Sequence, residues 1–467
     1  MLRIAEVGLG AAVCLSVLAF GGTAAPFFLV PQLIVLALGA FVVSASPRST
    51  LASVRLPLSA PLLLVALVLL QILPLPASFA QSFGAPGDDF LGPGHFTLSI
   101  APYQTVSHLL LLITCLTAFY LVLLVCQDRD AKKRLVYVLV GVGTFEALYG
   151  LLQYLTGWQQ IFTYVKKYYL EEATGTYINR NHFAGLLGMV LPFVVVLALG
   201  KAHTLRRAAG RSEVPAPGVL SSVELLPVVF WLFLASVIFT ALIFSRSRMG
   251  CVSALISLIA VLSLARTSQW SARTRAVIVT LFALGVVGLV VWIGSDPVIA
   301  RFETLGQEYG QTGQNRLSIW CDTLKLIHQH PLLGTGLGTF SVAYPSVQTA
   351  FLNLLVDHAH CDYLEVVSEL GLPGGILVFG SILWVHGQAV RHYWEAEDRF
   401  ETAICLGCAG SITAILVHSL GDFNLYIPAN ALVFAVIIAL AWSASQSQNN
   451  GYRCVSPRRD ASGKVHP

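Results

Sequence analysis

Residues 356–375, which read VDHAHCDYLEVVSELGLPGG, concentrate ionisable side chains in a chain that has few of them. The whole protein is 56% hydrophobic and only 11% charged, yet this stretch carries two histidines and four carboxylates. They are Asp357, His358, His360, Asp362, Glu365 and Glu369. Because histidine titrates near neutral pH, such a cluster is suited to general-base catalysis. These residues are the first candidates for a functional site.

The same stretch is predicted to form a helix that starts at Asp357 as the N-cap residue and stops at Gly371–Pro373. On this helix His360 would face a cavity at the membrane edge. His358 would point about 200° away, on the face that carries hydrated carboxylates. The two rings would then be unable to bind the same metal ion.

A zinc site is the alternative use of these histidines. His328-x-His330 and His358-x-His360 form two pairs, and strands would bring each pair onto one face. Because we predict helices here, we expect no metal.

Two further segments carry arginines at energetically unfavourable positions, one between apolar runs and one in the first turn of a helix. SRSRMG (245–250) lies between two apolar runs, so Arg246 and Arg248 must pair, line a watery cavity or reach the interface. Reaching the interface is the simpler interpretation of Arg248. NRLSIWCDTLKLIHQHP (315–331) is predicted to be an amphipathic helix along the membrane surface, with Arg316 in its first turn. A cation there opposes the helix dipole, which indicates an anionic partner.

The next segment, LLGTGLGTF (332–340), contains three glycines. Backbone N–H groups of such a loop can hold a phosphate. No strand precedes it and no βαβ unit surrounds it, so we predict a tight turn.

The elements that must position these residues are transmembrane helices. A mean hydropathy of +0.74 is typical of a polytopic membrane protein, and apolar runs of about 20 residues recur along the chain. We predict an all-α fold of about twelve transmembrane helices. Their expected ranges are 4–22, 27–45, 57–75, 106–126, 135–155, 182–200, 225–244, 249–265, 276–294, 374–390, 402–420 and 428–444.

The basic residues predict the orientation. With the N-terminus inside, most of the 28 Lys and Arg fall in inside loops, so both termini are expected to be cytoplasmic. The net charge of +4 is then a sign of topology and not of nucleic-acid binding. We expect helices one to nine in 1–295, a large outside loop in 296–372, helices ten to twelve in 373–445 and a tail in 446–467. The first span is not expected to be a cleaved signal peptide, because a second span follows at once.

The nine cysteines indicate little chemistry. Six lie in apolar spans and are expected to pack as small hydrophobes, including the C-x-x-C pair Cys405 and Cys408. Cys321 and Cys361 both fall in the large outside loop, where a disulfide is possible but cannot be derived from sequence.

At these residues the chain resembles the superfamily of O-antigen ligases and O-antigen polymerases. Its ligases have a histidine followed by Asn, Ser or Gln, nine residues, a glycine, two residues, and then Gly, Thr or Tyr. Here His360 and Cys361 are followed by nine residues, Gly371, two residues and Gly374. Cys361 departs from the pattern. Further similarity lies in GTYINRNHFAG (175–185), in the SR of SRSRMG, and in the order of Arg316, Trp320, His330-Pro331, GTGLGTF and the histidine pair.

The resemblance covers roughly residues 175–392 and implies a reaction. These enzymes transfer a glycan from undecaprenyl diphosphate to an acceptor sugar hydroxyl, on the periplasmic side of the bacterial inner membrane. The transfer inverts the anomeric carbon and uses neither metal nor cofactor, on a GT-C-like architecture. The acceptor is lipid A core for the ligases and another lipid-linked glycan for the polymerases.

The resemblance also implies roles for individual residues. His360 would be the general base, and Arg246 and Arg316 would bind the diphosphate by charge-assisted contacts. The remaining expected substrate-binding residues are Arg180, His182, His358 and Arg248.

Three alternatives stay open at this level. Cys361 could mark a different acceptor, and hence a polymerase or exopolysaccharide enzyme in place of a ligase. A transporter of polysaccharide or lipid-linked glycan would also need about twelve helices, although we find no two related halves. A family member without catalytic activity is the third.

Overall fold

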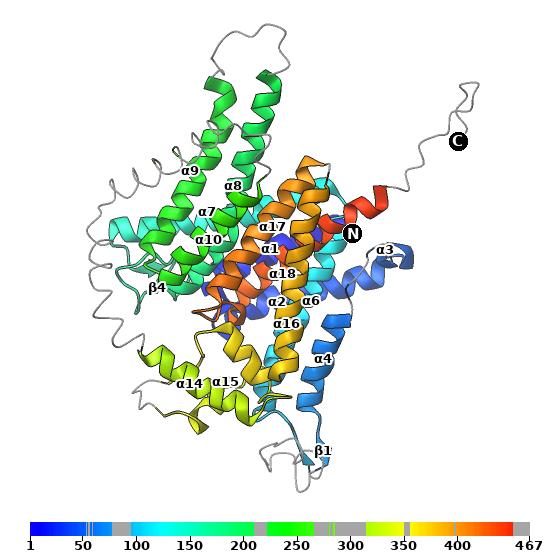
Figure 1. The fold of residues 1–467 in the computed structure, drawn as a ribbon, viewed down its shortest axis with the longest axis vertical. Helices are drawn as coiled ribbons and strands as arrows, with labels where there is room; N and C mark the ends of the chain where they lie inside the picture. Colours follow the sequence, from blue (N-terminus) through cyan, green and yellow to red (C-terminus); the bar gives the residue numbers. More distant parts are fainter. Residues whose placement is uncertain are drawn as a thin grey trace, which may run out of the picture.

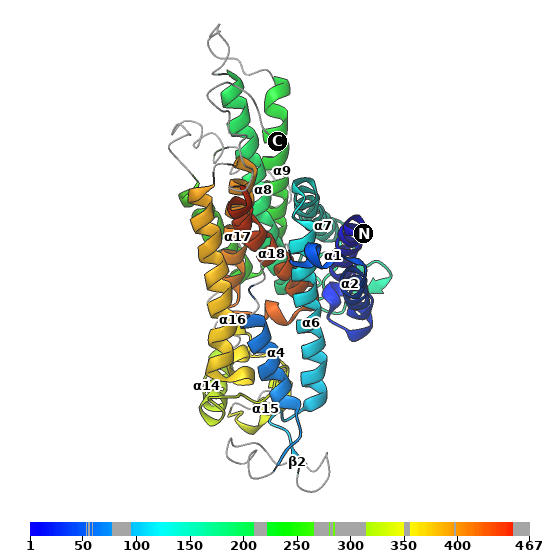
Figure 2. The ribbon, with the colours of Figure 1, turned by 90° about the vertical axis from the view of Figure 1, so that its right-hand side faces the viewer.

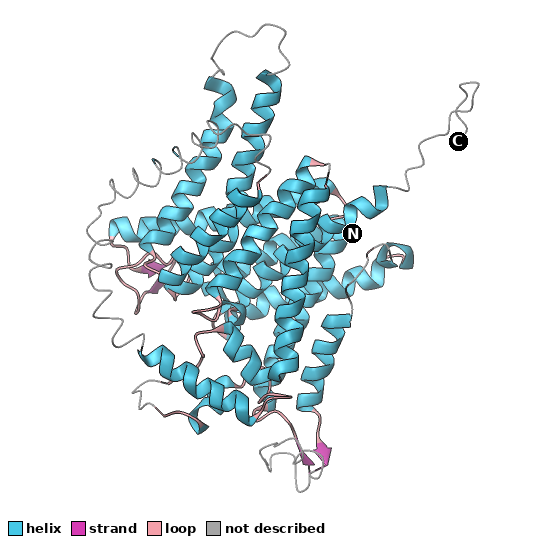
Figure 3. Cartoon of the chain, viewed as in Figure 1, coloured by secondary structure: helices cyan, strands magenta, loops and turns pink. Residues whose placement is uncertain are grey.

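The computed structural model of the chain describes residues 1–52, 54, 57, 59–76, 95–209, 222–265, 280, 284, 314–349, 355–396 and 398–451. Within these residues the fold is almost entirely helical (Figure 3). Strands form two short antiparallel pairs in the described part of the chain: β1 (Leu75–Pro76) with β2 (His95–Phe96), and β3 (Gln160–Ile161) with β4 (Tyr164–Val165). The predicted all-α class is confirmed.

Figure 1 shows how the helices are arranged. They are α1 (Leu2–Leu18), α2 (Ala25–Ala45), α3 (Arg48–Ala52), α4 (Ser59–Ile72), α6 (Pro102–Val125), α7 (Arg129–Thr156), α8 (Arg180–Ala209), α9 (Ser222–Phe244), α10 (Arg248–Leu264), α14 (Gln314–Gln329), α15 (Phe340–Ala343), α16 (Asp362–Glu395), α17 (Arg399–His418) and α18 (Pro428–Gly451), with the 3₁₀ turns η1 (Phe20–Gly22), η5 (Tyr344–Ser346) and η6 (Asn424–Tyr426).

Eight of the described helices are long and apolar enough to cross a membrane: α2, α6, α7, α8, α9, α16, α17 and α18. They correspond to eight of the twelve predicted spans. The predicted spans 4–22, 57–75 and 249–265 are the helices α1, α4 and α10, of 17, 14 and 17 residues. A 14-residue helix is only about 21 Å long, shorter than the ~30 Å hydrocarbon layer. The span 276–294 lies outside the described residues except for positions 280 and 284, so the number twelve stays a prediction.

The helix α17 packs against four other helices, α8, α10, α16 and α18. At the end where α7 and α17 begin, Arg129 binds Asp398 at 2.7 Å and Lys132 binds Glu401 at 2.8 Å. At the opposite end, α14 and α15 lie against the first part of α16 (Figure 1). Figure 2 shows α6 and α16 running along the molecule, with α4 packed against both.

The segment expected to be one helix from Asp357 is instead irregular up to residue 361. The helix α16 begins at Asp362 with Cys361 as its N-cap residue, so the prediction that Asp357 is the N-cap was wrong. Gly371 breaks the helical backbone as predicted, with φ 69° and ψ 176°, but α16 continues beyond it.

Two other local predictions have a clear outcome. The amphipathic helix expected over 315–331 is α14, which carries Arg316 in its first turn. Cys321 is exposed, Cys361 is buried and both thiols are free, so the disulfide alternative is not realised. Cys405 and Cys408 are completely buried within α17, where they pack as small apolar side chains.

Candidate functional site

The segment between α17 and α18, residues 419–427, is the point at which several helix ends meet. The backbone N–H of Asp362, at the start of α16, donates to the carbonyl groups of Ser419 and Asp422 at 3.0 and 3.1 Å. The Asp362 carboxylate in turn accepts from the Ser419 hydroxyl at 2.6 Å and from the Leu425 N–H at 3.2 Å. These bonds fix the start of α16 against this segment, and they show that Asp362 is a structural carboxylate.

The two carboxylates that follow Asp362 in the first part of α16, Glu365 and Glu369, are also satisfied inside the protein. Glu365 accepts from the Ala359 N–H at 2.8 Å and contacts His358 Nδ1 at 2.6 Å. Glu369 accepts from two backbone N–H groups of the glycine-rich segment, at 2.8 and 2.9 Å, and from the Tyr426 hydroxyl at 2.6 Å. Both side chains are at most 1% exposed. The prediction of a hydrated face bearing Asp362, Glu365 and Glu369 was therefore wrong, because protein donors replace water.

The glycine-rich segment 332–340 is the tight turn predicted from sequence, and it clasps the break in α16. A Cβ at Gly334, where φ is 66°, would lie 2.2 Å from the carbonyl of Glu369. A Cβ at Gly371 would lie 2.3 Å from the carbonyl oxygen of Leu332. Only glycine permits this close approach of two backbones. The amides that could have held a phosphate bind the Glu369 carboxylate instead.

His360 lies next to this meeting point, in a left-handed backbone conformation with φ 51°. Its Nδ1 is 3.8 Å from Asp422 Oδ1, and its ring contacts Phe423 edge-to-face at 5.1 Å. The side chain is 31% exposed, so a substrate can reach it. A non-glycine residue held at positive φ is frequently part of a functional site.

Asp422 is the unexpected residue of the cluster. It is 1% exposed, and neither carboxylate oxygen has a hydrogen-bond partner in the described part of the chain. His418 Nε2 lies 3.8 Å from its other oxygen. Burial alone would raise the pKa of Asp422, but the rings of His360, His182 and His418 hold that pKa well below its usual range. The group is thus a buried anion surrounded by imidazoles.

The predicted arginines lie on separate segments, and Arg316 is bound at this cluster. Arg316 Nη1 donates to the Gly421 carbonyl at 2.9 Å, which places the start of α14 beside Asp422. Arg180 pairs with Glu172 at 2.5 Å, and Arg246 pairs with Glu171 at 3.1 Å. Two adjacent carboxylates therefore each hold one arginine.

Arg246 and Arg248 lie in different surroundings from Arg316. Arg246 lines a small cavity of about 380 Å³ together with Tyr154, Leu170 and Glu171. Arg248 is the first residue of α10, half-buried and directly after the N-cap Ser247. Arg246 therefore faces a different cavity from the one beside His360.

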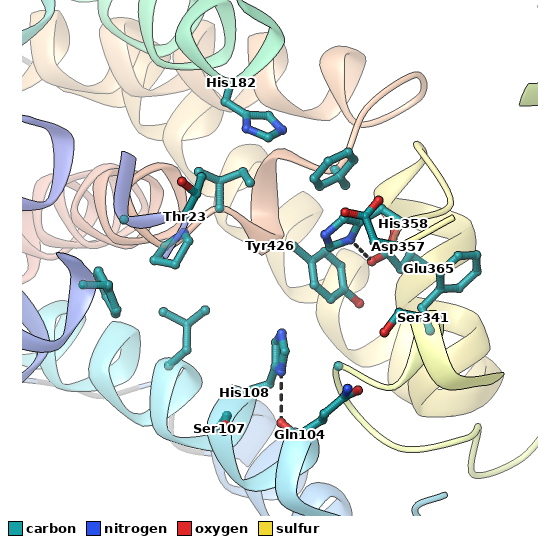
Figure 4. A pocket seen from close by; sticks show the side chains of 18 of the residues that line it. Thr23, Gln104, Ser107, His108, His182, Ser341, Asp357, His358, Glu365 and Tyr426 are labelled. Atoms are coloured by element: carbon teal, nitrogen blue, oxygen red, sulfur yellow. Dashed lines mark hydrogen bonds and ion pairs between the residues drawn. The ribbon is translucent and has the colours of Figure 1, made fainter. Parts of the chain in front are cut away.

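A cavity with a volume of about 920 Å³ lies next to the cluster (Figure 4). Of the residues predicted for the site, His182 and His358 line it, whereas His360 and the arginines do not. His182 comes from the start of α8 and is only 3% exposed. His358 stacks on Phe423 at 3.8 Å between ring centroids.

Sequence reasoning missed Asp422 and His418. The signal was present in HSLGDFN (418–424), where a histidine and an aspartate stand four residues apart between two apolar spans. Ionisable residues at a membrane boundary indicate function by default. Among the described residues, no group of three or more His, Cys, Asp or Glu side chains is placed to hold a metal ion.

The His358–Glu365 pair predicts a pH dependence of stability. Although burial disfavours the charged ring, Glu365 raises the pKa of His358 to about 9 from 6.5. A raised pKa contributes stability that is complete below the unfolded value and is lost as the pH rises through the folded value. The melting temperature of the purified protein should therefore fall between about pH 6.5 and 9, and fall less in His358→Gln. Parallel melting curves over this range would contradict the pairing.

Comparison with known proteins supports the resemblance seen in the sequence. Residues 232–379 match the protein-family model described as O-antigen ligase. No curated protein matches the chain. The matched segment contains Arg246, Arg316 and His360, whereas Arg180 and Asp422 lie outside it. The predicted relation to the O-antigen ligase and polymerase superfamily is confirmed over this segment.

Proposed function

Because residues 232–379 carry an O-antigen ligase domain, we propose that the protein is a membrane glycosyltransferase of the ligase type. It moves a glycan from undecaprenyl diphosphate to an acceptor sugar hydroxyl on the periplasmic side of the inner membrane. The acceptor is lipid A core. The observation that carries the proposal is the partly exposed His360 beside the buried Asp422 anion, with Arg316 bound one residue away.

The proposed reaction uses these groups in one displacement. His360 takes the proton of the acceptor hydroxyl while the acceptor oxygen attacks the anomeric carbon. The new glycosidic bond forms as the bond from the anomeric carbon to the diphosphate oxygen breaks on the opposite face, so the configuration inverts. The electron pair leaves with the diphosphate, and the proton on His360 returns to solvent or to the leaving group. Asp422 stabilises the imidazolium during the step.

The arginines receive the diphosphate in this proposal. Guanidinium groups bind phosphate oxygens in a bidentate manner and keep their charge when partly buried. In the structure Arg180 pairs with Glu172 and Arg246 pairs with Glu171. A bound diphosphate would displace these carboxylates, and Glu171, whose side chain is 80% exposed, is free to move into water.

Cys361 stands where the family pattern has Asn, Ser or Gln. This replacement is weaker evidence against a ligase than the sequence alone indicated. Cys361 is buried and occupies the N-cap position of α16, with no side-chain cap hydrogen bond. The Asn or Ser of the family pattern is a preferred N-cap residue. The substitution therefore bears on the cap of α16 and not on contact with the acceptor.

The test is a gel of surface polysaccharide from a deletion strain complemented with wild type or with Arg316→Ala. We expect the deletion to leave core lipopolysaccharide without O-antigen, while polymerised lipid-linked glycan accumulates. Arg316→Ala should restore less than a tenth of the O-antigen, because a charge-assisted phosphate contact is worth ~1.5–3 kcal/mol. Its control is Lys325→Ala, which removes an exposed cation from the same helix.

Other outcomes of this gel would replace the proposal. A core that carries a single repeat unit would identify a polymerase. Loss of lipid-linked glycan from the periplasmic leaflet, with full complementation by Arg316→Ala, would favour a transporter.

A further inference from the structure

The side chain of Arg180 is held by two partners of different chemistry. Its Nη1 donates to Glu172 Oε1 at 2.5 Å, and its guanidinium carbon lies over the ring of Tyr169, 5.2 Å from the ring centroid. A guanidinium group at this distance is attracted by the negative face of the aromatic ring. Tyr169 lies outside the segment that matches the family model, and the sequence did not single it out.

The two partners of Arg180 differ in how they meet a bound diphosphate. Glu172 occupies an N–H group of the guanidinium, and phosphate oxygens bind N–H groups of the same kind. The carboxylate therefore competes with the diphosphate for Arg180. Tyr169 attracts the cation through its ring face and uses none of the N–H groups, so its contact and a phosphate contact can be present together.

Tyr169 also has a backbone conformation that L-residues rarely adopt. Its φ is 55°, close to the 54° of Arg246 and the 51° of His360. His360 is the proposed base, and Arg246 is a proposed ligand of the diphosphate. Left-handed non-glycine residues cost free energy and cluster at functional sites. The same kind of strain therefore connects Tyr169 with the residues of the proposed reaction.

The segment that carries Tyr169 is fixed from two sides. Lys166, which directly follows β4, donates from Nζ to the Glu172 carbonyl at 3.1 Å. The Ala173 N–H donates to the Phe244 carbonyl at the end of α9, at 3.0 Å. These contacts hold the strained backbone, and with it the ring, in a defined position.

The phenol of Tyr169 lies among the charges of the candidate site. Burial raises its pKa, and the charges of Arg180, Asp422, Glu172 and Arg316 act on it as well. Such effects weaken with distance and are screened by water and salt. Tyr169 therefore belongs to the same site as Arg180, Arg316 and Asp422.

We infer that Tyr169 is a positioning residue for the diphosphate of the donor and that it acts through Arg180. The inference rests on the proposed function and adds a residue to its donor site. Without donor, Glu172 and Tyr169 both hold the guanidinium group. When the diphosphate takes the place of Glu172, the ring keeps the cation in position, so binding orders one fewer side chain.

The experiment compares Tyr169→Leu, which removes the aromatic face, with Tyr169→Phe, which keeps the ring and loses the hydroxyl. Initial transfer rates are measured with the full-length protein in lipid vesicles, with the lipid-linked glycan and the lipid A core varied in turn. For Tyr169→Leu we expect the donor KM to rise about 5-fold, the usual size of a cation–π contact, with kcat and the acceptor KM unchanged. Tyr169→Phe should keep the wild-type donor KM. The control is Tyr168→Leu, which removes a neighbouring ring that is 66% exposed.

Each other outcome has a distinct meaning. A folded Tyr169→Leu variant with the wild-type donor KM would overturn the inference and leave the proposed function intact. Equal losses in Tyr169→Leu and Tyr169→Phe would also overturn it, because the hydroxyl and not the ring would then be responsible. If Tyr169→Leu shows no cooperative melting, Tyr169→Asn carries the test, since asparagine suits the left-handed backbone and lacks the ring. A wild-type protein that transfers nothing would overturn the proposed function and the inference together.

Discussion

Replacing His360 with alanine is expected to lower the rate of glycan transfer by about 10²–10⁴-fold, the usual contribution of a general base. The side chain is partly exposed beside the buried Asp422 anion, and its removal leaves the acceptor hydroxyl with no base at that position. The measurement is the initial rate with purified protein in lipid vesicles at saturating donor and acceptor. Binding of both substrates should change little, so the loss should appear in kcat.

The matched control is His328→Ala, which removes an exposed histidine from α14 and should keep full activity. The same assay distinguishes His360 from its neighbour His358, which also contacts a carboxylate. If His360→Ala retained more than a tenth of the rate, and His358→Ala did not, the base would be His358. If both variants retained wild-type rates, the transporter interpretation would gain strength.

The sequence predicted the elements whose pattern is local. Long apolar runs gave the eight helices of spanning length, and helical spacing of apolar residues gave α14. The break at Gly371 followed from the glycine and the nearby proline. These features depend on a few neighbouring residues, so periodicity and turn chemistry are sufficient to find them.

The stretch from Val356 to Cys361 could not be predicted in the same way. It reads as helical, but long-range contacts hold it irregular: Trp320 Nε1 donates to the Ala359 carbonyl at 3.0 Å, and the Ala359 N–H binds Glu365. The sequence predicted that the carboxylates at the start of α16 are hydrated, because the groups that bind Asp362 and Glu369 lie on distant segments. A pattern of polar residues does not show whether water or protein satisfies them.

The residues of the candidate site also divide into those that the sequence predicts and those that depend on long-range contacts. His360 and Arg316 are both near the segment 419–427, as expected if they act together. The carboxylates that hold Arg180 and Arg246 were not foreseen, since the pairing of Glu172 and Glu171 depends on how the preceding loop folds back. Asp422 escaped notice because its imidazole partners come from α8, α17 and the segment before α16.

Replacing Asp422 with asparagine is expected to lower kcat about 10- to 100-fold, because the variant keeps the shape but loses a charge that stabilises an imidazolium by ~1.5–3 kcal/mol. Asp422 does not touch substrate in the proposed reaction, so it acts as a positioning residue. Its low pKa keeps it ionised across the working range. Without this anion the imidazolium that forms during the step is less stable, so the loss should appear in kcat while the KM of each substrate stays unchanged.

That split between kcat and KM separates a positioning role from a structural one, since a loosened fold would also raise the KM values and lower the melting temperature. Asp398→Asn is the control, because it removes a carboxylate from the opposite end of α17, where Asp398 pairs with Arg129. It should leave kcat unchanged. An Asp422→Asn variant with wild-type kcat would show that the buried anion serves only the packing of the segment 419–427. The base would then act without it.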